Sequence, residues 1–329
     1  MHNGQKVVDV HGHMTTPPQF RGHLAGMVAQ NTAGWGNLDI SDDQLEAAQA
    51  RHLKVMDERN IDLQLLGPRP IAMWQWLRPF LQADWCTKTN DVIAQICKLH
   101  PDRFMGMAQL PQSREKDTRN CIPEFERCVK ELGFVGAYVN PDPGADKQTP
   151  GMADEYWYPI YEKSVDLDAP LMVHPSTSHD PRIEHIPANY QMNNYIEEFL
   201  AMHILAHSKV FEVFPRLKII ICHCGGALNR FIPTDHHNSQ KDLRNNLFYD
   251  ACAYDTDFLT AAIKQRGVDQ MCFGTEAPGS GGAKRPDTGR PSDDLVPVID
   301  SLEFLTAEDK LKIFQKNPLK VFTRVKLPN

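Results

Sequence analysis

Val7-Val8-Asp9-Val10-His11-Gly12-His13, near the start of the 329-residue chain, is a short apolar run that ends in a His-x-His pair. A run this short and this apolar is typical of a strand buried on both faces, as in a parallel sheet. Side chains two positions apart on a strand point to the same side, so both imidazoles can converge on one ion. A bare His-x-His is more often two unrelated loop histidines, but its position at the end of a first strand favours a shared metal ligand role.

Seven further apolar runs, separated by helix-like segments, extend this pattern along the chain. The eight predicted strands are 7–10, 63–66, 104–108, 135–139, 171–173, 219–222, 247–250 and 271–274. The predicted helices are 41–59, 84–99, 120–132, 155–167, 194–207, 255–266 and 307–315. Eight strands alternating with helices predict an α/β protein with a (β/α)8 TIM-like barrel, and we expect one domain over residues 1–329. A doubly wound open sheet is the alternative, but no GxGxxG motif follows the first strand.

Composition excludes several classes of function. Lys and Arg number 35 and Asp and Glu number 42, for a formal charge of −7, so we expect no nucleic-acid or anionic-membrane partner. No run of about 18 apolar residues suggests a membrane span, and the first residues lack the apolar core of a signal peptide. Most of the 8 cysteines lie within apolar runs and none forms a CxxC pair, which predicts buried, reduced thiols in a cytoplasmic protein.

Other ligand-type side chains stand at the ends of other predicted strands. His174 follows 171–173, His223 follows 219–222, and Glu276 follows 271–274. The carboxyl ends of barrel strands meet at one mouth, so these residues and the His-x-His pair should surround a single site. A buried core histidine explains any one of them, but it explains poorly four histidines and a carboxylate that all stand at strand ends. This donor set suits Zn²⁺, with Mn²⁺ or Fe²⁺ as alternatives.

The same motifs carry a resemblance to the amidohydrolase superfamily. More narrowly, the chain is similar to the branch that holds aminocarboxymuconate-semialdehyde decarboxylase and 4-oxalomesaconate hydratase. The similar segments are His11-Gly12-His13-Met14-Thr15-Thr16, Pro68-Arg69-Pro70, Leu110-Pro111-Gln112-Ser113, Gly133-Phe134-Val135-Gly136, Asn140-Pro141-Asp142-Pro143, 157–163 and His174-Pro175-Ser176-Thr177-Ser178. Most of this branch has Asp after the eighth strand, whereas the hydratase and this chain have Glu.

The resemblance implies a role for each site residue. It implies that one metal ion, expected to be zinc, is held by four ligands: His11, His13, His174 and Glu276. It implies that His223 is the acid/base group, that Arg69 pairs with a substrate carboxylate, and that Tyr190 lies on the substrate side as a catalytic residue. Glu276 could also take or hold a proton.

Three segments depart from the hydratase pattern, so the metal site transfers more securely than the substrate pocket. Cys224 replaces a glycine, and both 227–231 and 277–282 differ from the hydratase. Asn140 follows the fourth predicted strand where a carbamylated-lysine binuclear centre would need lysine.

The sequence predicts the metal site better than it predicts the reaction. A divalent metal that lowers the pKa of water to about 7 serves a hydratase, a decarboxylase or a hydrolase equally. We expect a metal-dependent hydratase of a small unsaturated keto-di- or tricarboxylate, of the 4-oxalomesaconate type, in the catabolism of aromatic compounds. The alternatives are a nonoxidative decarboxylase of an aromatic or muconate-type acid, and a subunit of a hetero-oligomer with altered or no activity alone. The expected partner is a small anionic carboxylate substrate, and we expect a homo-oligomer.

Overall fold

The structure is a computed structural model that describes all residues except 1, 3, 188, 231–240 and 329, and the side chains of residues 189 and 190. Eight parallel strands pair in the order of the chain, from β1 to β8. They are β1 (Val8–His13), β2 (Leu63–Gly67), β3 (Phe104–Ala108), β4 (Gly136–Val139), β5 (Leu171–Val173), β6 (Ile219–Ile221), β7 (Leu247–Asp250) and β8 (Met271–Cys272).

The sheet closes on itself through the backbone of its first strand and the segment that follows its last strand. The Val10 N–H donates to the Phe273 carbonyl at 2.9 Å, and the Glu276 N–H donates to the His11 carbonyl at 2.8 Å. These bonds join the end of the sheet to its beginning, so the predicted (β/α)8 barrel is confirmed and the open-sheet alternative is wrong.

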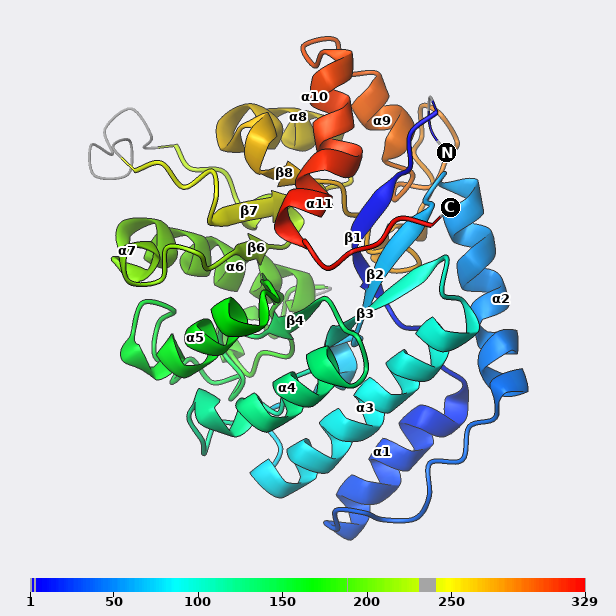
Figure 1. Ribbon diagram of the computed structural model, residues 1–329, viewed down its shortest axis with the longest axis vertical. Coiled ribbons are helices and arrows are strands. Elements are labelled where there is room, and N and C mark those ends of the chain that lie inside the picture. Colours follow the sequence, from blue (N-terminus) through cyan, green and yellow to red (C-terminus); the bar gives the residue numbers. More distant parts are fainter. Residues whose placement is uncertain (1, 3, 188, 231–240, 329) are drawn as a thin grey trace.

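Helices surround the barrel (Figure 1). The α-helices of the described chain are α1 (Pro18–Gln30), α2 (Asp42–Glu58), α3 (Pro79–Leu99), α4 (Ile122–Lys130), α5 (Tyr158–Leu167), α6 (Asn189–His207), α7 (Val210–Val213), α8 (Thr256–Arg266), α9 (Val296–Asp300), α10 (Ala307–Leu311) and α11 (Asn317–Val321). Helix α2 begins with a reciprocal capping box between Ser41 and Gln44. The sequence pattern did not predict α1, α7, α9 or α11.

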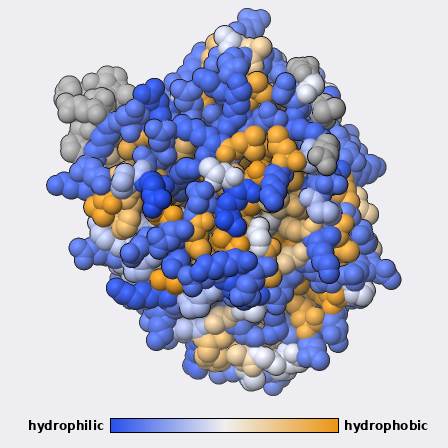
Figure 2. All heavy atoms as spheres, viewed as in Figure 1, coloured by the Kyte–Doolittle hydropathy of each residue, from blue (hydrophilic) through white to orange (hydrophobic). Residues whose placement is uncertain are grey.

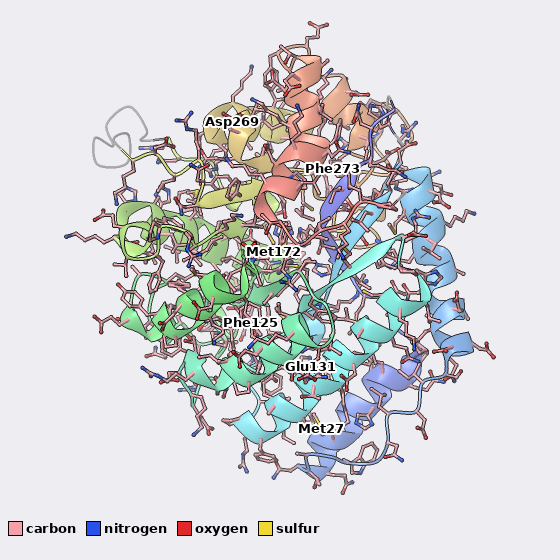
Figure 3. The ribbon with its side chains drawn as sticks, viewed as in Figure 1. Met27, Phe125, Glu131, Met172, Asp269 and Phe273 are labelled. Atoms are coloured by element: carbon pink, nitrogen blue, oxygen red, sulfur yellow. The ribbon has the colours of Figure 1, made fainter. Side chains whose placement is uncertain are left out.

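Two apolar layers hold the barrel together. The larger layer lies between the strands and the helices. It includes Met27 on α1 and Phe125 on α4, both labelled in Figure 3. The smaller layer fills the interior, with Met172 of β5 near its centre (Figure 3). Val321 and Phe322 from the C-terminal segment join this interior layer. Strands buried on both sides explain why their sequences are nearly continuous apolar runs.

The surface carries mostly polar side chains, with apolar ones gathered in patches near the centre of the face in Figure 2. None of the helices in the described chain is long and apolar enough to cross a membrane. All eight cysteines are free thiols, and seven of them are buried.

Candidate metal centre and active site

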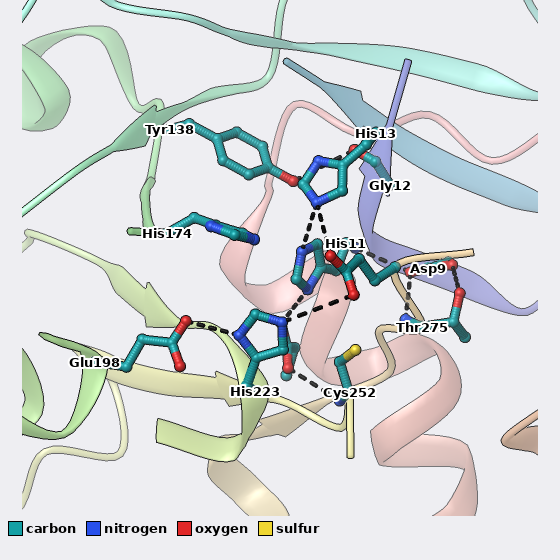
Figure 4. A network of polar contacts seen from close by, with 12 residues as sticks. Asp9, His11, Gly12, His13, Tyr138, His174, Glu198, His223, Cys252 and Thr275 are labelled. Carbon is teal, nitrogen blue, oxygen red and sulfur yellow. Dashed lines mark hydrogen bonds and ion pairs between the residues drawn. The ribbon is translucent and has the colours of Figure 1, made fainter. Parts of the chain in front are cut away.

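The predicted ligand residues meet at the carboxyl ends of the strands (Figure 4). His11 and His13 lie on β1, and their Nε2 atoms are 3.2 Å apart. His174 follows β5, and His223 begins the 3₁₀ turn η5 (His223–Gly225) after β6. One ligand atom each from His11, His174, His223 and Glu276 lies within 4.8 Å of the others. The barrel thus gathers all five residues that the sequence pattern singled out.

Two of these imidazoles donate to buried carboxylates. The His11 Nδ1–H donates to Asp250 Oδ2 of β7 at 2.7 Å, and both side chains are fully buried. The His223 Nδ1–H donates to Glu198 Oε1 of α6, also at 2.7 Å. A carboxylate on Nδ1 fixes the ring orientation and, in the neutral ring, leaves Nε2 as the acceptor, as it does in carboxylate–histidine–zinc arrangements. Asp250 is therefore placed to orient His11. Against the lowering effect of burial, Glu198 and Glu276 raise the pKa of His223 to about 10.

The other two imidazoles donate to backbone carbonyls. The His13 Nδ1–H donates to the Pro68 carbonyl at 2.9 Å, and the His174 Nδ1–H donates to the Pro175 carbonyl at 2.6 Å. His174 Nε2 is buried and has no hydrogen-bond partner among the described residues. All four histidines therefore use Nδ1 for support and turn Nε2 toward one point.

This donor set fits a divalent metal ion. Burial lowers the pKa of His13 to about 4 and holds the pKa of His174 well below its usual range, so both rings are neutral and able to ligate. Burial alone would raise the pKa of Glu276, but His13 and His223 hold that pKa well below the usual range. Neutral imidazoles with free Nε2 lone pairs beside an ionised carboxylate are the ligands that Zn²⁺ and its divalent neighbours prefer.

Glu276 takes an unusual backbone conformation. Its φ is +59°, and His223 and Cys224 have φ values of +49° and +58°. Such left-handed conformations are costly for residues with a Cβ, and they collect at functional sites. The Glu276 carboxylate is held in turn: Ser280 Oγ donates to Oε2 at 2.8 Å, and the Tyr254 hydroxyl lies 3.2 Å from the same oxygen. Oε1 faces the other way, 3.6 Å from His13 Nε2.

A buried network beneath the site supports the segment that leads to Glu276. Asp9 Oδ2 accepts hydrogen bonds from the Thr275 hydroxyl at 2.6 Å and from Gln64 Nε2 at 2.8 Å. Burial raises the pKa of Asp9 to about 6, against the lowering effect of these hydrogen bonds. Gly12 leaves room for this network, since a Cβ there would lie 2.3 Å from the Gln64 side chain.

Of the two residues predicted to contact the substrate, only Arg69 has a described side chain. Arg69 follows β2, and its Nη2 donates to the Pro278 carbonyl at 3.2 Å, which places it beside the segment that carries Glu276. The pKa of Arg69 is lowered by burial, an effect that Glu276 opposes. Tyr190 lies in the first turn of α6, and its side chain is outside the described part of the chain.

A pocket of about 460 Å³ opens beside the metal centre. His223 and Glu276 line it from the barrel, Asn194 and Tyr195 line it from α6, and Tyr254 lines it from the loop after β7. The pocket thus brings the acid/base candidates against a mixed wall, in which the hydroxyl and amide groups adjoin apolar residues such as Phe258, and a small substrate could lie there.

Sequence reasoning missed three residues of this site. Tyr254 and Ser280 lie in loops that follow strands, and loops of this kind form the functional face of a barrel, so their position was a usable signal. Glu198 had no local signal, because Glu197-Glu198 within a predicted helix looks like an ordinary solvated pair.

Comparison with known proteins identifies the family of this chain. A family model described as "Amidohydrolase" matches residues 8–324. This chain belongs to the amidohydrolase family. The resemblance inferred from the histidine motifs is therefore confirmed.

Three relatives illustrate the range within the family. The chain is 33% identical to 2-keto-4-carboxy-3-hexenedioate hydratase from Sphingobium sp., across 97% of this chain and 96% of the relative. It is 31% identical to gamma-resorcylate decarboxylase from Polaromonas sp., across 70% of this chain and 77% of the relative. The crystal structure of 4-oxalomesaconate hydratase from Rhodopseudomonas palustris superposes with a TM-score of 0.85 at 32% identity, and covers 97% of this chain and 96% of that one.

Proposed function

We propose that this protein is a metal-dependent hydratase that adds water across the carbon–carbon double bond of a small unsaturated keto-di- or tricarboxylate, of the 4-oxalomesaconate type. The observation that carries the proposal is the 33% identity to a hydratase along 97% of the chain, where the sequence match to gamma-resorcylate decarboxylase covers 70%. The catabolism of aromatic compounds is the corresponding metabolic setting.

The metal would be held by His11, His13, His174 and Glu276, with Zn²⁺ as the proposed ion and Mn²⁺ or Fe²⁺ as alternatives. When bound, a divalent metal supplies a Lewis acid that polarises substrate oxygens and makes water more acidic. His223 also lies in the cluster of convergent ligand atoms, 4.0 Å from Glu276 through Nε2. We assign it the acid/base role, because His223 lines the pocket as well as the centre.

The remaining work falls to side chains of this chain. The planar guanidinium of Arg69 would pair with a substrate carboxylate and orient the double bond. Hydration adds oxygen to one carbon and a proton to its neighbour, so the site needs one group to accept the proton of water and another to protonate carbon. His223 and Glu276 both line the pocket and are suited to these two roles. Tyr190 is proposed to contact the substrate.

The reaction type can be tested with the purified protein loaded with Zn²⁺. With 4-oxalomesaconate as substrate, we expect the absorbance of the conjugated double bond to fall without release of CO₂. In water enriched in ¹⁸O, the product should gain one labelled hydroxyl. Release of CO₂ in proportion to substrate loss would refute the hydratase proposal.

Nonoxidative decarboxylation is the second candidate, favoured by the 31% identity to gamma-resorcylate decarboxylase. In that case His223 or Glu276 would protonate the ring carbon that loses CO₂. A panel of hydroxybenzoates, assayed for CO₂ beside the keto-acid, separates the two reactions in one experiment.

Three further proposals concern the protein as a whole. We propose that residues 1–329 act as one domain, because a single barrel and its helices account for the described chain. We also propose that the protein is a homo-oligomer in the cytoplasm, where its eight free thiols would stay reduced. A hetero-oligomer in which this chain is inactive alone remains the alternative, and sedimentation of the purified, active protein distinguishes them.

A further inference from the structure

Glu198 is a buried carboxylate whose one hydrogen bond among the described residues is to His223. Its side chain has no exposed surface, and its Oε1 accepts the His223 Nδ1–H at 2.7 Å. Its Oε2 is also buried and has no hydrogen-bond partner among the described residues. Burying a carboxylate is costly unless it is paired, so a carboxylate with this one hydrogen bond is retained for what it does to His223.

Close packing brings the two side chains together. Gly226 has a φ of +77°, and a Cβ at this position would lie 2.4 Å from the Tyr195 carbonyl and 3.1 Å from the Glu198 Cβ. The turn after β6 can approach α6 this closely because residue 226 is glycine. The same contact also fixes where Glu198 meets the imidazole.

Glu198 comes from a helix, whereas the other three acceptors lie on or beside the barrel strands. Asp250 ends β7, Pro68 follows β2, and Pro175 follows β5. One turn before Glu198 on α6, Asn194 and Tyr195 line the pocket. His223 is thus oriented by the helix that also forms the wall of the pocket (Figure 4).

We propose that Glu198 is the positioning residue that holds His223 in its Nδ1–H tautomer, so that Nε2 is the atom that exchanges a proton with the substrate. The inference rests on the proposed function for its catalytic consequence, because it assigns the orientation of the proposed acid/base group. In enzymes whose catalytic base is oriented by a third side chain, loss of that side chain leaves the base in the wrong tautomer. Most of the activity is then lost although the fold is intact.

Two substitutions at residue 198 distinguish a loss of His223 orientation from a general loss of structure. Glu198→Ala removes the acceptor, and we expect kcat to fall about 10²- to 10⁴-fold while KM and zinc content change less than about threefold. Glu198→Gln keeps a side-chain oxygen that can accept from Nδ1, because its NH₂ group can occupy the site of the unpartnered Oε2. We expect it to retain at least ten times the kcat of Glu198→Ala. Formate, added to fill the cavity, should partly restore the alanine variant.

Glu197→Gln is the matched control, since Glu197 is the adjacent buried carboxylate and pairs with Lys147 at 2.7 Å instead of with His223. We expect this variant to keep kcat within about threefold of wild type. A comparable loss in Glu197→Gln and Glu198→Ala would show a general effect on α6 and overturn the proposal. Equal kcat in wild type and Glu198→Ala would overturn it as well.

A second readout is independent of turnover. In zinc-loaded protein labelled with ¹⁵N-histidine, the His223 signals are assigned by their loss in His223→Asn. At a pH where this ring is neutral, we expect a protonated Nδ1 and an unprotonated Nε2. The Glu198→Ala variant should show the opposite tautomer or a mixture. An unchanged tautomer would overturn the positioning role. If wild type does not hydrate keto-acids, the proposed function fails, and the NMR result still decides the role of Glu198.

Discussion

Asp250→Asn tests whether the support of His11 sets metal affinity. Asp250 uses both carboxylate oxygens as acceptors: Oδ2 takes the His11 Nδ1–H at 2.7 Å, and Oδ1 takes the Cys252 N–H at 3.0 Å. Asparagine has one oxygen, so its NH₂ group must face one of these two donors. Either the Cys252 N–H loses its acceptor, or His11 changes tautomer and turns a proton toward the metal.

Close packing around Asp250 limits any backbone shift that would satisfy both donors. A Cβ at Gly274 would lie 2.8 Å from the Asp250 Cβ and 3.1 Å from the His11 Cβ, so the three backbones are in close contact. Loss of such an outer partner typically weakens metal affinity about 10- to 100-fold, which is about 1.4–2.7 kcal/mol. A buried N–H without an acceptor would cost the fold about 1–3 kcal/mol as well.

Metal affinity is measured by equilibrium competition for Zn²⁺ between the metal-free protein and a chromophoric chelator. Asp269→Asn is the control, because Asp269 pairs with Lys312 at the surface and lies outside the metal centre. We expect its Kd to equal that of wild type and the Kd of Asp250→Asn to rise at least tenfold. If folded Asp250→Asn bound Zn²⁺ within twofold of wild type and also kept the free energy of unfolding of wild type, neither donor would have lost its acceptor and the reasoning would be refuted.

Three more predictions concern pH, packing and substrate binding. Burial lowers the pKa of His52 to about 4 from 6.5, so the unfolded state binds more protons below pH 6.5 and stability falls as the pH falls. At pH 5 the loss relative to pH 7 is about 2 kcal/mol, and urea unfolding of His52→Gln should show a pH dependence smaller by that amount, whereas parallel curves would contradict it. Gly226→Ala should lower the free energy of unfolding by at least about 2 kcal/mol, because its Cβ would lie 2.4 Å from the Tyr195 carbonyl at a φ of +77°. Gly282→Ala, with no atom within 4 Å, should stay within about 0.5 kcal/mol of wild type, and equal losses in urea would exclude this explanation. Arg69→Lys should raise KM for the keto-acid about tenfold with little change in kcat, since lysine lacks the planar fork; an unchanged KM would remove Arg69 from the binding site.

The strands were predictable because their sequences reflect burial on both faces. The runs 104–108, 171–173 and 247–250 were predicted with the bounds that the structure has. Helix α1 was not predicted, because it begins at a proline and contains Gly22 and Gly26, both poor helix formers. Its stability comes from tertiary packing of Phe20, Leu24 and Met27, which only the folded chain reveals.

The amino-acid sequence by itself determined the barrel and the five residues around its mouth, because a ligand at the end of a buried parallel strand must lie near the other strand ends. Its local patterns are sufficient for that inference, since each of these residues lies on its own strand or within four residues after it. The tertiary structure alone decided how the ligands are oriented. Asp250 lies 239 positions from His11 and Glu198 lies 25 from His223, so neither hydrogen bond leaves a local pattern in the sequence. Those contacts exist because the closed barrel and the packing of α6 bring distant carboxylates to the Nδ1 atoms, and they leave every Nε2 free for the metal or the substrate.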